Sequence, residues 1–362
     1  MIVTKHLRAL VAVGAVLGVA AACGSPPPEN GGESGGESGA KDFKACMVSD
    51  SGGFSDKSFN ETSHKGLLDA EKKLGIERAQ LESESDTDYT ANIDSLIGQD
   101  CNLIVTVGYL LADATYDAAK ENPDVNFAIV DYSYDPEEYE PLDNVKSLVF
   151  NAAQSSFLTG YVAAGMSETK VVGTFGGEKI PTVTIFMDGY AEGVQYYNQE
   201  KGEDVQVRGW DREKRDGTFI DSFKDKNKAK NTTNNLISQD ADVIHPVAGE
   251  AGLGTMEATR NNDATVVWVD TDGCVSAEEY CSDIVTSSEK RLDLAVERTV
   301  TEAYNGKFDT TPYVGTLEND GVRMSSFHEF EDQVPAELKQ EVEDLRQQLI
   351  DGEIELESPD QP

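Results

Sequence analysis

The sequence predicts an α/β protein made of two doubly wound parallel-sheet lobes joined by a hinge. Two observations lead to this fold class. Short apolar runs alternate with amphipathic segments of helical length, and the series stops before Asn151 and starts again near Val171. Strands that alternate with helices are typical of βαβ units, in which the strands are parallel. Without its terminal segments the chain keeps roughly 320 residues, which favours two domains over one.

The expected strands are short apolar runs that end in polar residues. They are Lys44–Val48, Leu103–Val107, Phe127–Val130 and Ser147–Phe150 in the first series, and Val171–Phe175, Gln206–Gly209, Val243–Val247, Val266–Val269 and Asp283–Thr286 in the second. The expected helices are Ser58–Leu74, Thr90–Gln99, Leu111–Glu121, Ser155–Met166, Thr182–Gln199, Lys226–Gln239, Gly254–Asn261 and Pro335–Ile350.

Residues 1–22 predict a signal peptide. Lys5 and Arg8 precede an apolar stretch that ends at Ala22 and is short for a membrane span. Small residues lead directly into Cys23, which we expect to be acylated; plain secretion with an incidental Cys23 is the alternative. Residues 23–41 are rich in Gly, Ser, Pro and Glu and predict a lipid-anchored flexible tether. The protein is therefore expected to be exported and anchored by lipid to the outer face of the cell membrane.

The charge of the chain excludes some classes of partner. Acidic residues number 67 against 30 Lys and Arg, for a formal net charge of −37. Nucleic-acid binding needs clustered Lys and Arg, and adsorption to anionic lipid headgroups needs a basic surface. Neither nucleic acid nor an anionic lipid surface is therefore an expected partner.

Four cysteines follow Cys23, and an even number in an exported protein favours disulfides. Cys274 and Cys281 bracket a short loop, whereas Cys46 and Cys101 lie at the starts of two apolar strands. We expect the pairs Cys46–Cys101 and Cys274–Cys281. Metal binding is the alternative, but the sequence has no CxxC pair and its four histidines are scattered. No metal and no cofactor are expected.

Polar residues follow several of the expected strands. In open parallel sheets, ligands bind beyond the carboxyl ends of the strands. Two such edges that face each other would form a cleft that closes on a polar ligand by hinge motion. The polar strand ends are Ser49-Asp50, Gly108-Tyr109 and Asp131-Tyr132 in the first series, and Gly176-Gly177, Gly249-Glu250 and Asp270-Thr271-Asp272 in the second.

The segment from Met47 to Asn60, MVSDSGGFSDKSFN, resembles the opening of the basic membrane protein family, the PnrA-like, purine-nucleoside-binding lipoproteins of ABC transporters. Further matches follow in the same order and cover nearly all of the mature domain. They are Leu103–Tyr109, Ala112–Thr115, Phe127–Asp131, Ser156–Ala164, Val172–Gly177, Ala241–Ile244, Val247–Gly249, Val269–Asp272 and Thr286–Arg291.

The resemblance implies a type I periplasmic-binding-protein fold, nucleoside uptake and no enzymatic activity. Residues 42–150 plus about 273–310 would form lobe 1, and residues 151–272 plus about 311–362 would form lobe 2. In lobe 1, Asp50 and Asn60 would bond polar edges of the ligand, Phe59 would stack on its base, and Asp131 would accept from base nitrogen donors.

The resemblance assigns four further ligand-binding positions, which are Gly249, Asp270, Asp272 and Lys290. Gly249 would let the backbone approach the ligand, Asp270 or Asp272 would take ribose hydroxyls, and Lys290 would support them.

The chain departs from the family pattern at two places. The stretch from Val207 to Phe219 is longer and more charged than expected, and Pro246 follows His245 where an apolar strand residue is expected. The sequence does not decide which residue forms the second aromatic wall of the site; the candidates are Trp210, Phe175 and Phe186.

These observations predict a monomeric lipoprotein that binds a purine nucleoside, or a similar small polar ligand, and delivers it to an ABC transporter permease. Two alternatives stay open: a sugar or other small-ligand binding protein, and a ligand sensor that presents its closed form to a membrane receptor. A nucleoside hydrolase has little support, because no aspartate cluster at metal-ligand spacing stands out.

Overall fold

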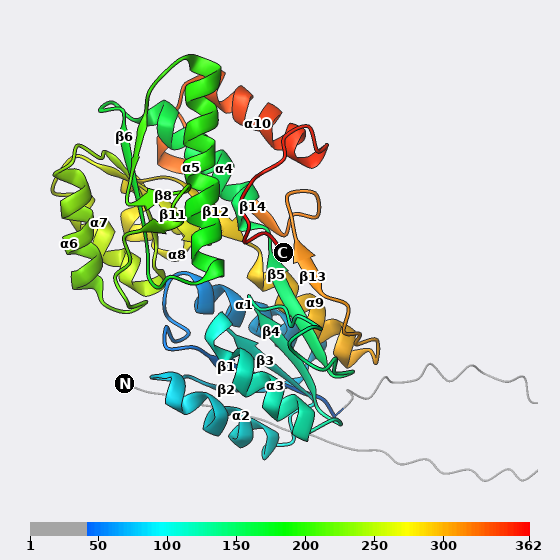
Figure 1. Ribbon diagram of the computed structural model, residues 1–362. Helices are drawn as coiled ribbons and strands as arrows, with labels where there is room; N and C mark the ends of the chain where they lie inside the picture. The colour runs from blue at the N-terminus through cyan, green and yellow to red at the C-terminus, as the bar shows by residue number, and fades with distance from the viewer. Residues whose placement is uncertain (1–41) are drawn as a thin grey trace, which may run out of the picture. The chain divides into compact units, whose positions relative to one another are not determined.

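The computed structural model describes residues 42–362, so the expected signal peptide (1–22), the tether (23–41) and Cys23 lie outside the described residues. Within the described part, the strands form two six-stranded sheets and one two-stranded hairpin (Figure 1). Each large sheet is the centre of one lobe, which confirms the predicted fold class. None of the helices in this range has the length and apolarity needed to cross a bilayer.

The sheet of lobe 1 has the strand order β13-β5-β4-β3-β1-β2, and all its strands are parallel. Alternate residues of each strand pack on opposite faces of this sheet. Met47 and Val105 face the core that α1 and α9 cover, whereas Cys46 and Ile104 face the core that α2 and α3 cover. The elements are β1 Lys44–Ser49, α1 Phe59–Leu74, β2 Glu77–Leu81, α2 Tyr89–Ile97, β3 Leu103–Val107, α3 Ala112–Glu121, β4 Asn126–Val130, β5 Val145–Phe150, α9 Leu292–Tyr304 and β13 Tyr313–Gly315.

The sheet of lobe 2 has the order β14-β12-β11-β10-β6-β7, in which β14 is antiparallel to β12. With each lobe numbered separately, both sheets share the doubly wound order 2-1-3-4-5. The elements are α4 Ala152–Met166, β6 Val171–Gly176, α5 Pro181–Lys201, β7 Gln206–Arg208, α6 Lys226–Ile237, β10 Val243–Val247, α7 Leu253–Thr259, β11 Thr265–Asp270, α8 Gly273–Ser276, β12 Ile284–Lys290, β14 Val322–Met324 and α10 Ala336–Ile350.

The strand pairing corrects part of the expected division into lobes. Residues from about 273 to 310 were expected in lobe 1, but β12 pairs with β11 in lobe 2. The chain returns to lobe 1 only with α9, which packs on α1, and with β13, which pairs with β5 although residues after about 310 were expected in lobe 2. The polar sequence TSSEK, residues 286–290, hid the length of β12, because these buried residues pair with polar groups such as Ser155, Ser325 and Arg323 and not with an apolar core.

Of the elements that were not anticipated from the sequence, β2 is the longest strand and α9 the longest helix. The edge strand β2 is polar and partly exposed, so it lacks the apolar run that marks the central strands. Helix α9 does carry the signal, because Leu292, Ala295, Val296 and Val300 repeat at helical spacing and are buried.

Both expected disulfide pairs are present in the structure. Cys46 on β1 is bonded to Cys101, which precedes the neighbouring strand β3, with the two Cα atoms 6.0 Å apart. Cys274 is bonded to Cys281, with Cα atoms 4.5 Å apart, and this bond closes the loop that follows α8.

Pro246 lies in the interior strand β10 and has no amide hydrogen to donate to β11. The paired residues of β10 and β11 are Val243 with Thr265 and Ile244 with Val266. In a parallel ladder of this register, the amide of residue 246 would donate to the carbonyl of Val267. Instead, Nδ1 of His245 lies 3.0 Å from that carbonyl oxygen. The His245 side chain thus replaces the hydrogen bond that Pro246 cannot make, and the strand stays in the sheet.

The role of His245 predicts a pH-dependent stability. Burial lowers the pKa of His245 to about 4, so the ring is neutral in the folded protein. An exposed histidine titrates near about pH 6.5, and unfolding therefore takes up a proton between these values. The stability that this site contributes is complete above about pH 6.5 and falls by about 3 kcal/mol as the pH drops to about 4.

The matched variant is His245→Asn, whose side-chain amide can keep the bond to Val267 but does not titrate in this range. Urea unfolding at about pH 7.5 and about pH 4 should show the wild type losing stability relative to this variant. A difference between the two proteins that does not change with pH would contradict the assignment.

Candidate functional site

A cavity lies between the carboxyl edges of the two sheets, with about 570 Å³ of empty space that is partly open to solvent. Residues from both lobes line it, as expected for doubly wound sheets. The structure brings seven of the eight expected ligand-binding residues to its wall, which are Asp50, Phe59, Asn60, Asp131, Gly249, Asp270 and Lys290.

The loop after β1 places Asp50 at the cavity. Its Oδ1 accepts from the backbone amide of Gly52 and from Nδ2 of Asn60, both at 2.8 Å. Gly108 lies against the other carboxylate oxygen, because a Cβ atom there would come within 2.8 Å of Oδ2, and its φ of 125° favours glycine. Burial raises the pKa of Asp50, while the bonds from Gly52 and Asn60 oppose this effect.

Asp131 and Asp270 occupy equivalent positions in the two lobes. Asp131 directly follows β4, and Asp270 is the last residue of β11; each of these strands is the fourth of its lobe. Both residues have a left-handed backbone, with φ of 67° for Asp131 and 66° for Asp270. This conformation is uncommon outside glycine and turns both carboxylates toward the facing lobe. Gly249, two residues after the end of β10, also has a positive φ, of 54°.

Lys290 joins these two carboxylates. Its Nζ lies 2.6 Å from Oδ2 of Asp131 and 3.2 Å from Oδ1 of Asp270. Burial lowers the pKa of Lys290, but the two carboxylates more than offset this effect, so the pKa is raised and the ammonium stays charged. The same nitrogen lies 4.6 Å from the ring centre of Phe59 and 5.2 Å from that of Phe186. The Lys290 ammonium at the cavity wall therefore lies among two carboxylates and two aromatic rings.

Other direct contacts hold the two lobes together beside the cavity, an arrangement we describe as closed. The Ser58 hydroxyl, at the start of α1, donates to Asp270 of lobe 2 at 2.8 Å. Nε1 of Trp268 in lobe 2 donates to the carbonyl of Lys57 in lobe 1 at 3.2 Å.

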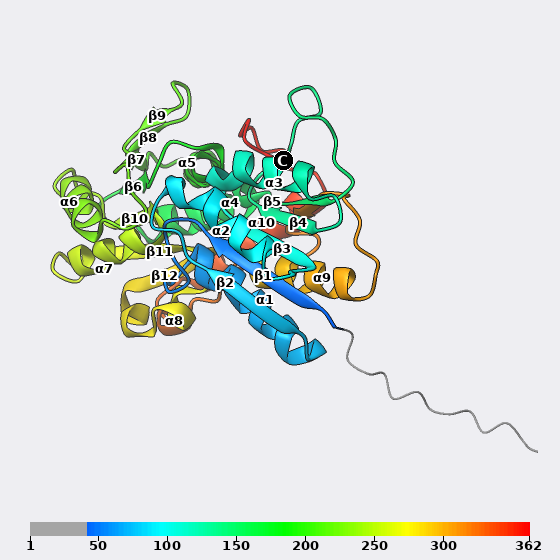
Figure 2. The ribbon, with the colours of Figure 1, turned by 90° about the horizontal axis from the view of Figure 1, so that it is seen from below.

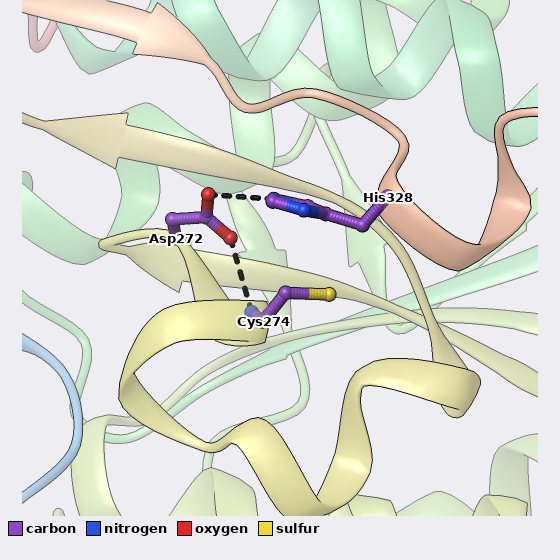
Figure 3. A group of neighbouring side chains, drawn as sticks. All are labelled: Asp272, Cys274 and His328. Carbon is purple, nitrogen blue, oxygen red and sulfur yellow. Dashed lines mark hydrogen bonds and ion pairs between the residues drawn. The ribbon is translucent and has the colours of Figure 1, made fainter.

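Asp272 is the one expected residue that does not line the cavity. It caps α8 by accepting from the backbone amide of Cys274 at 3.0 Å, and its other oxygen lies 2.7 Å from Nε2 of His328 (Figure 3). Asp272 lies two residues after the end of β11, so its carboxylate is at the start of α8 and not at the cavity. The cluster of Asp272, Cys274 and His328 offers no free thiolate, because Cys274 is bonded to Cys281.

Among the three candidates for the second aromatic wall, Phe186 on α5 lines the cavity. Phe175 is fully buried in the lobe 2 core, and Trp210 belongs to the hairpin of β8 (Trp210–Asp211) and β9 (Asp216–Gly217). Figure 2 shows this hairpin, which is the charged insertion, projecting at the β7 edge. It is docked on α5, because Trp210 and Arg215 both bond the buried carboxylate of Asp188.

Sequence reasoning missed several cavity residues. Asp56 is buried at the start of α1, and burial raises its pKa to about 7 against the effect of three backbone amide donors. Its place inside the motif of residues 47–60 was a usable signal. Phe223, Thr182 and Val183 also line the cavity, but they lie in a loop and on a helix face that no local pattern distinguishes.

Comparison with known proteins gives the family. Residues 43–360 match the family described as "ABC transporter substrate-binding protein PnrA-like". A "CD4+ T-cell-stimulating antigen" of Listeria innocua is 31% identical over 375 residues and 98% of each chain. An "ABC transporter nucleoside-binding protein BmpA" of Lactococcus lactis is 29% identical over 88% of this chain and 90% of its own. A solute-binding protein of an ABC transporter system from Aeropyrum pernix K1 superposes with a TM-score of 0.77 at 24% identity, covering 88% of this chain and 94% of its own.

The likeness to the Aeropyrum pernix structure supports the fold. The family match supports the family, since residues 43–360 include both lobes and the whole cavity. The chain therefore belongs to the PnrA-like family of ABC transporter substrate-binding proteins.

Proposed function

We propose that the cavity binds a purine nucleoside and that the protein, lipidated at Cys23 on the outer face of the cell membrane, delivers it to an ABC transporter permease. The observation that carries the proposal is that Phe59 from lobe 1 and Phe186 from lobe 2 both line the cavity beside Lys290, Asp131 and Asp270. Aromatic faces stack on a planar base, and carboxylates accept from base N–H groups and from vicinal hydroxyls.

In this arrangement the base lies against Phe59 and Phe186, and Asp131 accepts from a base nitrogen. Asp270 and Lys290 take the ribose hydroxyls, as acceptor and donor respectively. Because residues of both lobes contact the ligand, it favours the closed arrangement over the open one, and the permease can distinguish loaded from empty protein by that difference.

The direct test is calorimetric titration with adenosine, guanosine, inosine, cytidine, uridine and ribose, after the protein has been unfolded and refolded to remove any ligand it retains. Micromolar or tighter binding of purine nucleosides, with ribose silent, is expected. Binding of ribose alone would favour the sugar-binding alternative. Silence from every nucleoside would overturn the proposed ligand and leave the family assignment unchanged.

Phe59→Ala and Phe186→Ala are each expected to lower the affinity for the preferred purine nucleoside by about 10- to 100-fold, because each removes one stacking face. Phe308→Ala provides the control for Phe59→Ala, since both side chains are partly buried against the lobe 1 core but Phe308 does not line the cavity. Equal effects from all three substitutions, measured in the same titration, would argue against stacking.

A further inference from the structure

The side-chain oxygen of Asn60 is an unpaired acceptor at the proposed site. Asn60 is 2% exposed and lines the cavity. Within residues 42–362, no group donates a hydrogen bond to its Oδ1. Buried polar atoms are nearly always paired, and leaving an acceptor unpaired is unfavourable. The oxygen therefore points to a donor that a ligand would bring.

Two carboxylates determine the orientation of this amide. Nδ2 of Asn60 donates to Oδ1 of Asp50 at 2.8 Å and to Oδ2 of Asp56 at 3.1 Å. The reversed amide would place Oδ1 against both carboxylate oxygens, so that acceptors would face acceptors. Both amide hydrogens are thus engaged by the protein, and Oδ1 is the polar atom that Asn60 has left for a ligand.

Asp56 is held in turn by the beginning of α1. Its carboxylate accepts from the backbone amides of Ser58, Asn60 and Glu61 at 3.0, 2.8 and 3.0 Å. The first amides of a helix have no partner within the helix, and Asp56 satisfies them here. With the bond from Nδ2 of Asn60, each oxygen of Asp56 accepts two N–H groups. The backbone thus anchors Asp56, and Asp56 anchors the Asn60 side chain.

We propose that Asp50 and Asp56 hold Asn60 as a fixed hydrogen-bond acceptor, so that the cavity selects nucleobases with an N–H donor and discriminates against purines that have none. This inference rests on the proposed function, and it makes Asp56 a positioning residue for ligand selection. Neighbouring groups reinforce the selection. Both hydrogen bonds that Asp50 accepts end on its Oδ1, so its Oδ2 is left to accept from a ligand. Asp131 provides a further carboxylate at the cavity.

The test compares ligands on the unaltered, refolded protein. Adenosine offers a 6-amino donor, inosine an N1–H donor and guanosine both N1–H and a 2-amino group, whereas purine riboside has the same ring and ribose with no N–H on its base. The tightest of the three donor-bearing nucleosides is expected to bind about 10- to 100-fold more tightly than purine riboside. Purine riboside binding within about twofold of the tightest nucleoside would overturn the inference and leave the proposed function standing. Absence of binding by all four would overturn both.

Substitutions then test the positioning role of Asp56. The quantity measured is the ratio of the affinities for purine riboside and adenosine, which a general loss of stability does not change. Asn60→Leu removes the acceptor, and Asp56→Ser keeps an acceptor for the helix amides while freeing the Asn60 amide to turn. Both are expected to shift the ratio toward unity by about threefold or more, and Asp50 and Asp131 keep the remaining selection. The control is Asp225→Ser, because Asp225 caps α6 by accepting from the amides of Asn227 and Lys228 and is not among the residues that line the cavity. A wild-type ratio in Asp56→Ser would overturn the role of Asp56.

Discussion

Replacing Lys290 by Met is expected to destabilise the closed arrangement of the lobes by about 3–5 kcal/mol, because two buried carboxylates would lose their shared cation. Lys290 is 3% exposed, and Asp131 and Asp270 are 7% and 6% exposed. Lobe opening relieves their repulsion by exposing both to water. Small-angle scattering should therefore show a larger radius of gyration, and affinity for the preferred nucleoside should fall by about 100-fold or more.

Protonation of a carboxylate is the other way in which the repulsion between Asp131 and Asp270 can be reduced, and it makes the effect of Lys290→Met depend on pH. Burial raises the pKa of Asp131, and Lys290 opposes this effect in the wild type. Without Lys290 the pKa of Asp131 rises further, so the destabilisation is expected to be largest near neutral pH and to shrink as the pH falls and the carboxyl is protonated.

The matched control is Lys73→Met, which changes the net charge by the same amount. Lys73 is paired with Glu297, but its side chain is 59% exposed. Exposed ion pairs contribute about 0–1 kcal/mol, so this variant should scatter like the wild type. Indistinguishable scattering and affinity for the two variants would show that the buried cation does not hold the lobes together.

Removing the Cys46–Cys101 disulfide by a double substitution to Ala is expected to lower the free energy of unfolding by about 4 kcal/mol. The two cysteines are 55 residues apart in the chain. A cross-link over a loop of this length restricts the unfolded chain, and the restriction grows with the logarithm of the loop length. Both residues are buried in the lobe 1 core, where Ala keeps the site apolar.

The Cys274–Cys281 bond is the internal comparison for this prediction. These residues are 7 apart, and the same relation gives about 2 kcal/mol for their replacement by Ala. Urea unfolding of the two double variants measures both values. A larger loss from the short loop than from the long one would contradict the chain-entropy explanation and indicate that local packing dominates.

The fold was predictable because the central strands of both lobes are buried on both faces. Such strands need continuous apolar runs, and Leu103–Val107 and Val266–Val269 carry them almost without interruption. Strand β2 and the polar end of β12 were missed for the opposite reason. The first lies at a sheet edge, and the second is buried among hydrogen-bonding partners such as Ser155, Ser325 and Arg323, so neither needs an apolar sequence.

The candidate site was predictable where position alone brings a residue to the cavity. Asp50, Asp131 and Asp270 lie at the carboxyl ends of strands, and the geometry of a parallel sheet collects such ends at one edge. Phe186 and Phe223 lie on a helix and in a loop. Their approach to the cavity depends on how those segments pack, which leaves no local trace in the sequence.

The sequence by itself determined the two-lobed α/β architecture, the family and most of the cavity wall, because periodicity and strand-end polarity are local properties of the chain. Only the tertiary structure decided which lobe holds β12, that Asp270 and not Asp272 faces the cavity, and which way the Asn60 amide points. Each of these depends on a pairing register, a backbone angle or a hydrogen-bond partner. Those are set by contacts between separate segments, and so they exist only once the chain has folded.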